Sequence, residues 1–322
     1  MIKAVIFGCG RIAGGVNNAL FTHGGAYQDR AGVSIVACVD ADQGKSDSFA
    51  ETYHCEAEKT LHLALNKHQP DIISVCSPDD THFSITEQIL QATHTPKVIF
   101  LEKPVCSSND ELEHLIVMAT QAKVSIVANH SRRFDQHHQQ IKSRISDGEF
   151  GTLRNIYATY YSGWQHNGVH IIDTLSYLFN ESITVDTITS SWNSPYENDP
   201  TMEVVASFKK QNVKIHLLGF HENDYQIFEM DLRFSKARLR FEDFGERILL
   251  ETKYINEINE NVIQLVDNGL EDKTKTSMQQ AIDLICRSIE ENNTSLLDGY
   301  LLQNVATTMN TIWQGQKVYE QS

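Results

Sequence analysis

Glycines near the start of the chain and a carboxylate at residue 40 have the spacing of a dinucleotide site. An apolar run over residues 4–7 stops at Gly8, and Gly10 and Ala13–Gly14 complete the pattern G-x-G-x-x-A-G. Gly8 permits a tight turn, and Gly10 lets the backbone approach a pyrophosphate. We expect a helix to follow at once and to offer its first N–H groups to the phosphates.

Asp40 ends the next apolar strand, over residues 33–39. A carboxylate there accepts hydrogen bonds from both ribose hydroxyls and repels a 2′-phosphate, which favours NAD over NADP. Gly10 and Asp40 lie further apart than the usual spacing of roughly 20 residues. The excess falls in residues 21–32, FTHGGAYQDRAG, which we interpret as a loop inserted after the first helix.

Lys103 could hold a substrate hydroxyl and assist proton transfer, because it follows the predicted strand Lys97–Leu101 at the carboxyl edge of a sheet. Glu102 could orient it, and Pro104 fixes the chain after it. An exposed surface lysine is the alternative.

Two further candidates for acid–base chemistry are histidines in the segment GWQHNGVHIIDTLSYLF, residues 163–179. Its apolar residues repeat at helical spacing, and His170 and Asp173 would share one face. A histidine exchanges protons near neutral pH, and a carboxylate can hold its tautomer. A metal at His166 and His170 is disfavoured, since no third ligand has the right spacing, and structural histidines are the alternative.

The strand over residues 71–76 ends in SPDDTH, which should lie near the nucleotide, although a plain turn and helix cap would also explain it. The predicted cofactor-binding residues are therefore Gly8, Gly10, Arg11, Ile12, Asp40, Ser77, Pro78, His82, Glu102 and Lys103.

A doubly wound sheet would bring these candidate residues together, and the first part of the chain has the alternating strand and helix pattern of such a sheet. Short apolar runs, typical of strands covered on both faces, alternate with helical segments over 81–92 and 109–120. After about residue 150 seven strands with short turns follow one another, which predicts an antiparallel sheet. We therefore expect an α/β Rossmann domain over 1–123. A second, α+β domain with a mostly antiparallel open sheet would span 124–322, its C-terminal helices packing on the first domain.

Composition narrows the classes of function. The net charge of −15 over 322 residues argues against nucleic-acid and anionic membrane surfaces, and no apolar stretch is long enough for a membrane span. The N-terminus enters a strand directly, without a signal-peptide pattern, so we expect a cytoplasmic protein. The six cysteines form no C-x-x-C pair and are expected to be reduced thiols.

Taken in order, these motifs resemble the Gfo/Idh/MocA family, which includes glucose–fructose oxidoreductase and inositol dehydrogenase. The resemblance extends over nearly the whole chain and rests on GCGRIAG at 8–14, VD at 39–40, SPDDTH at 77–82, EKP at 102–104, RRF at 132–134, GEFGTL at 148–153, GVHIID at 168–173 and LLDGYLLQNV at 296–305.

The resemblance implies hydride transfer between a nicotinamide and a carbon of a sugar or cyclitol, with catalytic roles for Lys103 and His170. It also implies a homodimer or homotetramer formed through the antiparallel sheet. The family carries an aspartate four residues before the catalytic histidine, where this chain has His166. A histidine cannot tune His170 as a carboxylate would. The predicted substrate-binding residues are Lys103, Arg133, His166, Asn167, His170 and Asp173, and His166 is counted as catalytic too.

A narrower similarity, carried by THGGAY at 22–27 and the HNGVHIID helix start, is to members associated with surface polysaccharides and nucleotide sugars. It would let His23 and Tyr27 reach the active site, although a surface loop is favoured. We therefore expect an NAD-dependent oxidoreductase acting on a carbohydrate. The alternatives are a redox-neutral enzyme of the NAD-dependent glycosidase type, with retained cofactor, and a non-catalytic NAD-binding regulator.

Overall fold

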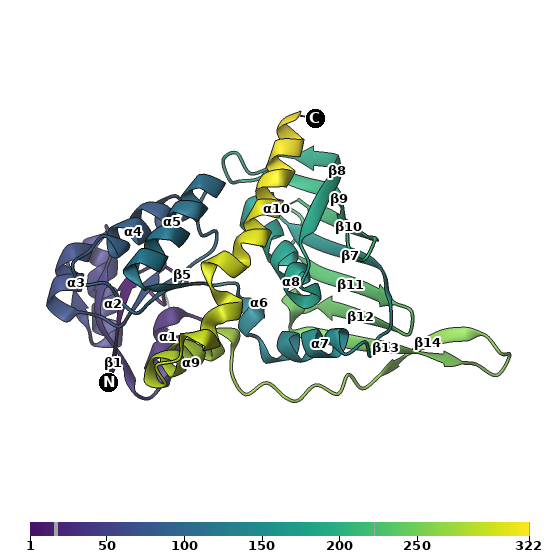
Figure 1. Cartoon of the computed structure of the whole chain (residues 1–322), viewed down its shortest axis with the longest axis horizontal. Coiled ribbons are helices and arrows are strands. Elements are labelled where there is room, and N and C mark those ends of the chain that lie inside the picture. Colours follow the sequence, from purple (N-terminus) through teal and green to yellow (C-terminus); the bar gives the residue numbers. More distant parts are fainter. Residues whose placement is uncertain (16–18, 222, 322) are drawn as a thin grey trace. The chain divides into compact units, whose positions relative to one another are not determined.

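The computed structural model describes residues 1–15, 19–221 and 223–321 (Figure 1). The chain forms two units. The first comprises Met1–Gln136 and Lys273–Ala306, and the second comprises His137–Asp272 and Thr307–Ser322. Within the described ranges, no helix is long and apolar enough to cross a membrane.

A six-stranded sheet forms the centre of the first unit, and every neighbouring pair of strands in it is parallel. The order β3-β2-β1-β4-β5-β6 reverses direction between β1 and β4, where open α/β sheets bind ligands beyond their strand ends. The predicted Rossmann architecture is confirmed. The strands are β1 (Ile2–Phe7), β2 (Val33–Val39), β3 (Glu56–Ala57), β4 (Ile72–Val75), β5 (Val98–Leu101) and β6 (Ser125–Ala128).

Side-chain caps begin five α-helices in the described part of this unit. The side chains of Thr22, Asp42, Thr60 and Ser108 accept hydrogen bonds from backbone N–H groups of the first turn, and Thr276 forms a capping box with Gln279. The helices of the unit are α1 (His23–Asp29), α2 (Gln43–Tyr53), α3 (Leu61–His68), α4 (His82–Leu90), α5 (Asn109–Ala122), α6 (Ser131–Phe134) and α9 (Ser277–Glu290), with short 3-10 helices at Asp79–Thr81 and Thr294–Tyr300.

The second unit is built on an eight-stranded sheet in the order β14-β13-β12-β11-β7-β10-β9-β8. Its neighbours are antiparallel except β10 and β7, which are parallel. The predicted α+β architecture is confirmed. The strands are β7 (Leu153–Tyr161), β8 (Ile183–Trp192), β9 (Thr201–Phe208), β10 (Val213–Phe220), β11 (Phe228–Phe234), β12 (Ala237–Glu242), β13 (Arg247–Ile255) and β14 (Asn261–Val266).

Burial alternates along β10, β11 and β12, so one face of this sheet is covered and the other is open. The apolar face of α8 (Val169–Phe179) is buried, and Phe179 packs against Phe208 of β9 at 5.1 Å between ring centroids. The unit also contains α7 (Gln136–Ser146), a π-helical turn η2 (Trp164–Gly168), the 3-10 turn η3 (Asp243–Gly245) and most of α10 (Leu302–Gln321).

The predicted domain ranges 1–123 and 124–322 differ from the two units in two places: the first boundary lies later, and a C-terminal segment belongs to the first unit. Strand β6 pairs in parallel with β5, so the first unit continues to Gln136. Residues 273–306 also belong to the first unit. Gln279 of α9 donates a hydrogen bond to Asp29 at 2.7 Å, and Thr276 donates one to the carbonyl of Leu20.

Residues 21–32 are not the surface loop that we expected, because His23–Asp29 form α1 and residues 23–27 are buried. The predicted helix directly after the glycine turn is also wrong for the described residues. Residues 11–15 form turns and a bend, and residues 16–18 lie outside the described range.

Candidate functional site

The glycine turn lies against the end of β4. Gly8 has a φ of +89°, and a Cβ there would lie 2.5 Å from the backbone nitrogen of Ser77. Only glycine therefore allows the two strand ends to approach so closely. A Cβ on Gly10 would meet nothing within 4 Å, so space remains outside the turn at this position. Arg11 and Ile12 are exposed.

The first N–H groups of α1 are used within the protein. Those of His23 and Gly24 donate to the carbonyls of Ile12 and Ala13 at 3.1 and 2.8 Å, and that of Gly25 donates to Thr22 Oγ1. Phosphate recognition by these groups, as the sequence suggested for a helix after the turn, is therefore not supported by the structure. The helix holds the glycine turn in place instead.

Asp40 lies directly beside the turn. Its carboxylate accepts hydrogen bonds from the backbone N–H of Cys9 at 2.7 Å and of Asp42 at 2.8 Å. Cys9 is the residue between the two glycines, so Asp40 fixes the turn and places a negative charge next to it. The contact of Asp40 with an adenosine ribose stays a prediction.

His82 connects two loops at the carboxyl edge of the sheet. Its fully buried ring lies 2.6 Å from the carbonyl oxygen of Pro104 and 2.9 Å from that of Ser77. Both ring nitrogens are thus occupied by backbone carbonyls. His82 therefore positions the loops after β4 and β5, while Pro78 is exposed on the first of them.

Glu102 is a buried carboxylate immediately before Lys103. Its Oε1 lies 2.8 Å from His23 Nε2 and accepts a hydrogen bond of 2.6 Å from Asn129. Burial, the largest influence, raises the pKa of Glu102, but the hydrogen bonds from His23 and Asn129 and the charges of His23 and Lys103 outweigh it and lower the pKa. The carboxylate therefore stays charged beside Lys103, which is half-buried after β5.

His23 extends this network towards the centre of the sheet. Its Nδ1 lies 3.0 Å from Ser74 Oγ, which lies 3.0 Å from Tyr27 OH. Burial raises the pKa of Tyr27, so its hydroxyl stays protonated. Of the two residues in segment 21–32, His23 contacts Glu102 directly, whereas Tyr27 contacts Ser74. No local sequence pattern identifies the partner of His23, because Glu102 follows 79 residues later.

In the second unit, η2 and α8 carry the remaining candidates. Asn167 donates to the carbonyl of Ser162 at 2.6 Å. Asp173 is buried and accepts a hydrogen bond from Thr308 of α10 at 2.9 Å, which indicates a structural role. His166 and His170 are half-buried. Lys103 belongs to the first unit and His170 to the second.

Arg133 has a structural contact in the first unit. Its guanidinium donates to the carbonyl of Gly299 at 3.0 Å, and 5% of the residue is exposed. It therefore joins α6 to the segment before α10.

Asp199, which the sequence analysis missed, lies against η2. Its two carboxylate oxygens accept hydrogen bonds from the backbone N–H groups of Gln165 at 2.7 Å and His166 at 2.9 Å. Burial raises the pKa of Asp199, and these hydrogen bonds oppose that effect. The ring of His166 stacks on Tyr196 with centroids 3.8 Å apart. A carboxylate from the loop before β9 therefore lies beside the position where the resembling family carries its aspartate.

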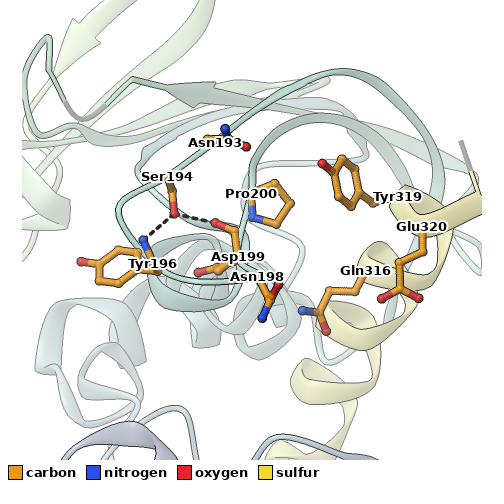
Figure 2. Close-up of a pocket in the computed structure, with 9 residues that line it drawn as sticks. All are labelled: Asn193, Ser194, Tyr196, Asn198, Asp199, Pro200, Gln316, Tyr319 and Glu320. Atoms are coloured by element: carbon orange, nitrogen blue, oxygen red, sulfur yellow. Dashed lines mark hydrogen bonds between the residues drawn. The ribbon is translucent and has the colours of Figure 1, made fainter.

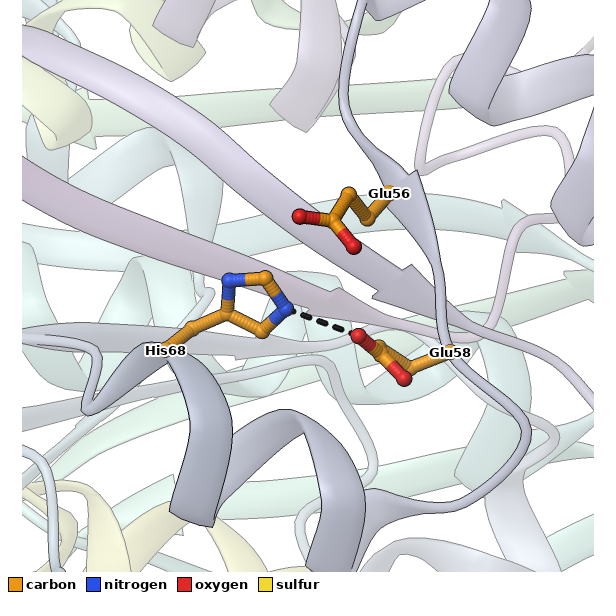
Figure 3. Close-up of side chains that lie close together, drawn as sticks. All are labelled: Glu56, Glu58 and His68. Atoms are coloured by element: carbon orange, nitrogen blue, oxygen red, sulfur yellow. Dashed lines mark hydrogen bonds and ion pairs between the residues drawn. The ribbon is translucent and has the colours of Figure 1, made fainter.

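A cluster of Glu56, Glu58 and His68 brings three potential metal ligands together (Figure 3). The ammonium of Lys67 already pairs with both carboxylates there, at 3.0 Å from Glu58. His68 and Lys67 also lower the pKa of Glu58. The cluster is accounted for by ion pairs, so we assign no metal to it.

Comparison with known protein families agrees with the Rossmann architecture of the first unit. Residues 2–130 match a family described as an oxidoreductase family with an NAD-binding Rossmann fold. An inositol 2-dehydrogenase of Rhizobium meliloti is 27% identical over 158 residues, which are 49% of this chain and 44% of that protein. The chain thus matches less than half the length of this curated relative.

Solved structures extend the similarity of fold over nearly the whole chain. An aldose-aldose oxidoreductase from Caulobacter crescentus, complexed with glycerol, has a TM-score of 0.80 at 12% identity and covers 100% of this chain and 98% of that one. An oxidoreductase from Agrobacterium radiobacter, in complex with NAD+, L-tartaric acid and magnesium, has a TM-score of 0.72 at 12% identity, with coverage of 97% and 94%. The family match confirms the resemblance to the Gfo/Idh/MocA family over residues 2–130, which are less than half of the chain.

Proposed function

Because residues 2–130 match an oxidoreductase family with an NAD-binding Rossmann fold, we propose that the chain is an NAD-dependent oxidoreductase acting on a carbohydrate or cyclitol. One observation carries the proposal. Lys103 lies at the carboxyl edge of the parallel sheet, next to a buried carboxylate that two hydrogen bonds keep in place. The inositol 2-dehydrogenase and aldose-aldose oxidoreductase relatives support a polyhydroxylated substrate.

The residues at the glycine turn fit a dinucleotide. Gly10 leaves space for a pyrophosphate, and Asp40 would accept hydrogen bonds from the adenosine ribose. The charge of Asp40 disfavours a 2′-phosphate, which is our reason for NAD rather than NADP. When bound, the nicotinamide supplies a carbon that accepts or donates hydride.

Lys103 would hold the substrate hydroxyl and move its proton. A cationic ammonium donates a hydrogen bond to the hydroxyl or carbonyl oxygen, and the adjacent Glu102 carboxylate stabilises that charge. His170, at the start of α8, is the second proposed proton carrier. Asp199 would take over the electrostatic role of the family's aspartate, since it lies against the backbone of His166.

Replacement of Lys103 tests this proposal. Lys103→Ala should lower kcat by about 10²–10⁴-fold while NADH binding persists, because general acid–base groups contribute about that much. Lys97→Ala is the matched control: Lys97 precedes the other end of the same strand, where it pairs with Asp71 at 2.9 Å. Equal turnover by the two variants would remove Lys103 from the chemistry.

We also propose that the open face of the eight-stranded sheet joins copies of the chain. Tyr157 stacks on His216 at 4.8 Å between centroids, and Arg233 lies over the same tyrosine at 5.0 Å. Leu218 is exposed on the same strand as His216. An aromatic, arginine and leucine group on an open sheet has the composition of an interface centre.

A further inference from the structure

Sheet edges carry backbone groups that can bind a further strand, and each sheet of this chain ends in two edge strands. Proteins protect such edges by keeping the strand very short or by covering it with another segment. Both devices are present in the first unit. β3 is only two residues long, and β6 is covered where Val127 forms an antiparallel bridge with Leu301.

In the second unit, helix α10 protects the edge formed by β8. Thr311 donates a hydrogen bond to the carbonyl of Ile183 at 2.8 Å. The side-chain amide of Gln314 accepts from the N–H of Val185 at 3.2 Å and donates to its carbonyl at 3.4 Å. Two register shifts interrupt the pairing of β8 with β9. Beyond the end of β8, the loop over 193–200 lines a pocket together with the last turns of α10 (Figure 2).

The edge formed by β14 lacks these protections in the described part of the chain. Its sequence, NVIQLV, contains no charged residue and no proline. Its pairing with β13 runs without a register shift from Val266 to Asn261. The side chains of Ile263 and Leu265 are exposed. Because charges, prolines and bulges are what prevent an exposed strand from adding to another, β14 has the properties of a strand that binds a partner.

The outer half of the β13–β14 hairpin has little support from its own sheet. The pairing of β12 with β13 ends at Ala237 and Thr252, whereas that of β13 with β14 continues to Ile255 and Asn261. Figure 1 shows the hairpin extending past the neighbouring strand. A two-stranded hairpin alone is only marginally stable in water. A further strand on the outer side of β14 would therefore stabilise it.

The side chains of β14 alternate between the two sides of the sheet. Val266 lies opposite Leu250, which is buried, so it points to the covered side. Alternation places three residues on that side and two on the open side: Val262, Gln264 and Val266, and Ile263 and Leu265.

A second copy of β14 complements both rows of side chains. Two identical strands related by a two-fold axis pair antiparallel, and residues directly opposite one another point to the same side. In the register centred on Gln264, which then lies opposite itself, Val262 faces Val266. Ile263 faces Leu265 in the same register. Aliphatic side chains thus meet on both sides, and the two amides can exchange hydrogen bonds.

The neighbouring register is less favourable. If the axis passed through Ile263, Val262 would face Gln264 and Leu265 would face Asn261, so that each aliphatic side chain would meet an amide. Charge is compatible with a second copy as well, because the chain carries a net charge of −15 but this strand contributes none of it.

We propose that β14 of one copy pairs antiparallel with β14 of a second copy, in the register centred on Gln264, so that one sheet continues through both. This edge contact is distinct from the contact proposed for the open face, and it does not depend on the oxidoreductase activity. One strand from each copy makes a contact smaller than the roughly 1,200 Å² of stable interfaces, so we expect weak association that adds to the open-face contact.

Sedimentation velocity of the full chain over a dilution series tests the edge contact. Each variant is also made together with Leu218→Asp, which removes the proposed open-face contact. Gln264→Lys places two ammonium groups opposite one another, and Leu265→Lys places one opposite Ile263. We expect each to raise the dissociation constant at least about tenfold, because like charges and unpaired charges oppose association.

Ile255→Lys is the matched control. Ile255 is 64% exposed, against 60% for Leu265, and it points to the same open side, but it lies on the inner strand β13. Its replacement should leave the edge contact intact. Cross-linking tests the register: Gln264→Cys should form a disulfide between two copies, because directly opposite residues have Cβ atoms within about 4.5–5.5 Å. Ile255→Cys should not.

Three results would overturn the edge contact. The first is a Leu218→Asp variant that stays monomeric at every concentration. The second is association that neither Gln264→Lys nor Leu265→Lys weakens. The third is equal weakening by Ile255→Lys, which would show that the open side of the hairpin, and not its edge, binds the second copy.

Discussion

At the scale of single residues, the negative charge of Glu102 is the main electrostatic feature beside Lys103 at the carboxyl edge of the sheet. Glu102 is 8% exposed, and the hydrogen bonds with His23 and Asn129 both involve Oε1. Glutamine at this position would keep an acceptor oxygen there and lose only the charge. Its effects therefore isolate the electrostatic contribution from packing.

Glu102→Gln should lower the free energy of unfolding at pH 7 by about 1 kcal/mol, the difference between charged and neutral hydrogen bonds. The pKa of Glu102 is lowered in the folded state. Its stabilisation is therefore complete above its unfolded pKa of about 4.3 and lost as pH falls through the folded pKa. Urea unfolding between pH 3 and 7 should show a shallower acid dependence in the variant.

Glu87→Gln is the control for this measurement. Glu87 pairs with His114 at 2.9 Å, but both side chains are substantially exposed, so the pair should contribute little. A Glu102 variant with the acid dependence of the wild type would show that its carboxylate is not charged in the fold.

At the scale of elements, helix α1 is the element that the sequence analysis did not predict. Gly24 and Gly25 have low helix propensity, so the segment has the composition of a loop. The structure explains one of them by close packing: a Cβ on Gly24 would lie 2.4 Å from the ring of Tyr53 and 2.8 Å from the carbonyl of Ala13. Tertiary contacts thus override propensity here, and no local pattern could have revealed it.

The cap of α1 allows a matched test. Thr22→Ala and Thr60→Ala each remove a hydroxyl that accepts a first-turn N–H at 3.2 Å, so each should cost about 1 kcal/mol of stability. Only Thr22 precedes the helix that carries His23, so only Thr22→Ala should also lower kcat. Equal turnover by the two variants, measured well below their unfolding temperatures, would contradict a positioning role for α1.

Other elements were predictable because their signals are local. Turn residues follow the continuous apolar runs of five strands, β1, β2, β4, β5 and β6, and Ser108 directly precedes α5 and caps it. The parallel pairings of β7 with β10 and of the edge strand β3 with β2 depend on partners that are not adjacent in the chain. Asp199 lies 33 residues from His166, so its contact with η2 was equally invisible.

At the scale of the whole molecule, the division of the chain follows from strand pairing and helix contacts rather than from a linker. Residues 273–306 return to the first unit, where Arg30 pairs with Asp283 and Glu290 of α9, both at 2.9 Å. The sequence shows no composition shift at these crossings. Truncation after residue 272 would therefore remove part of the first unit.

The proposed association through the sheet is testable by one substitution. Light scattering should give a dimer or tetramer for the wild type, and Leu218→Asp should yield a smaller species, because a carboxylate at an apolar interface centre is desolvated without a partner. Leu63→Asp, on α3, changes a leucine of similar exposure, 45% against 39%, and should leave the assembly intact. A wild-type monomer would contradict the proposal.

The dinucleotide site is the central claim, and titration with NADH and NADPH, followed by nicotinamide fluorescence, tests it most directly. We expect NADH to bind at least about tenfold more tightly, because in the proposed site the carboxylate of Asp40, which accepts from the N–H of Cys9, would bind the ribose and oppose a 2′-phosphate. Asp40→Ser should reduce that ratio, and Asp47→Ser, an exposed aspartate on α2, should preserve it. Binding of neither nucleotide would contradict the account, and tighter NADPH binding would contradict the role of Asp40.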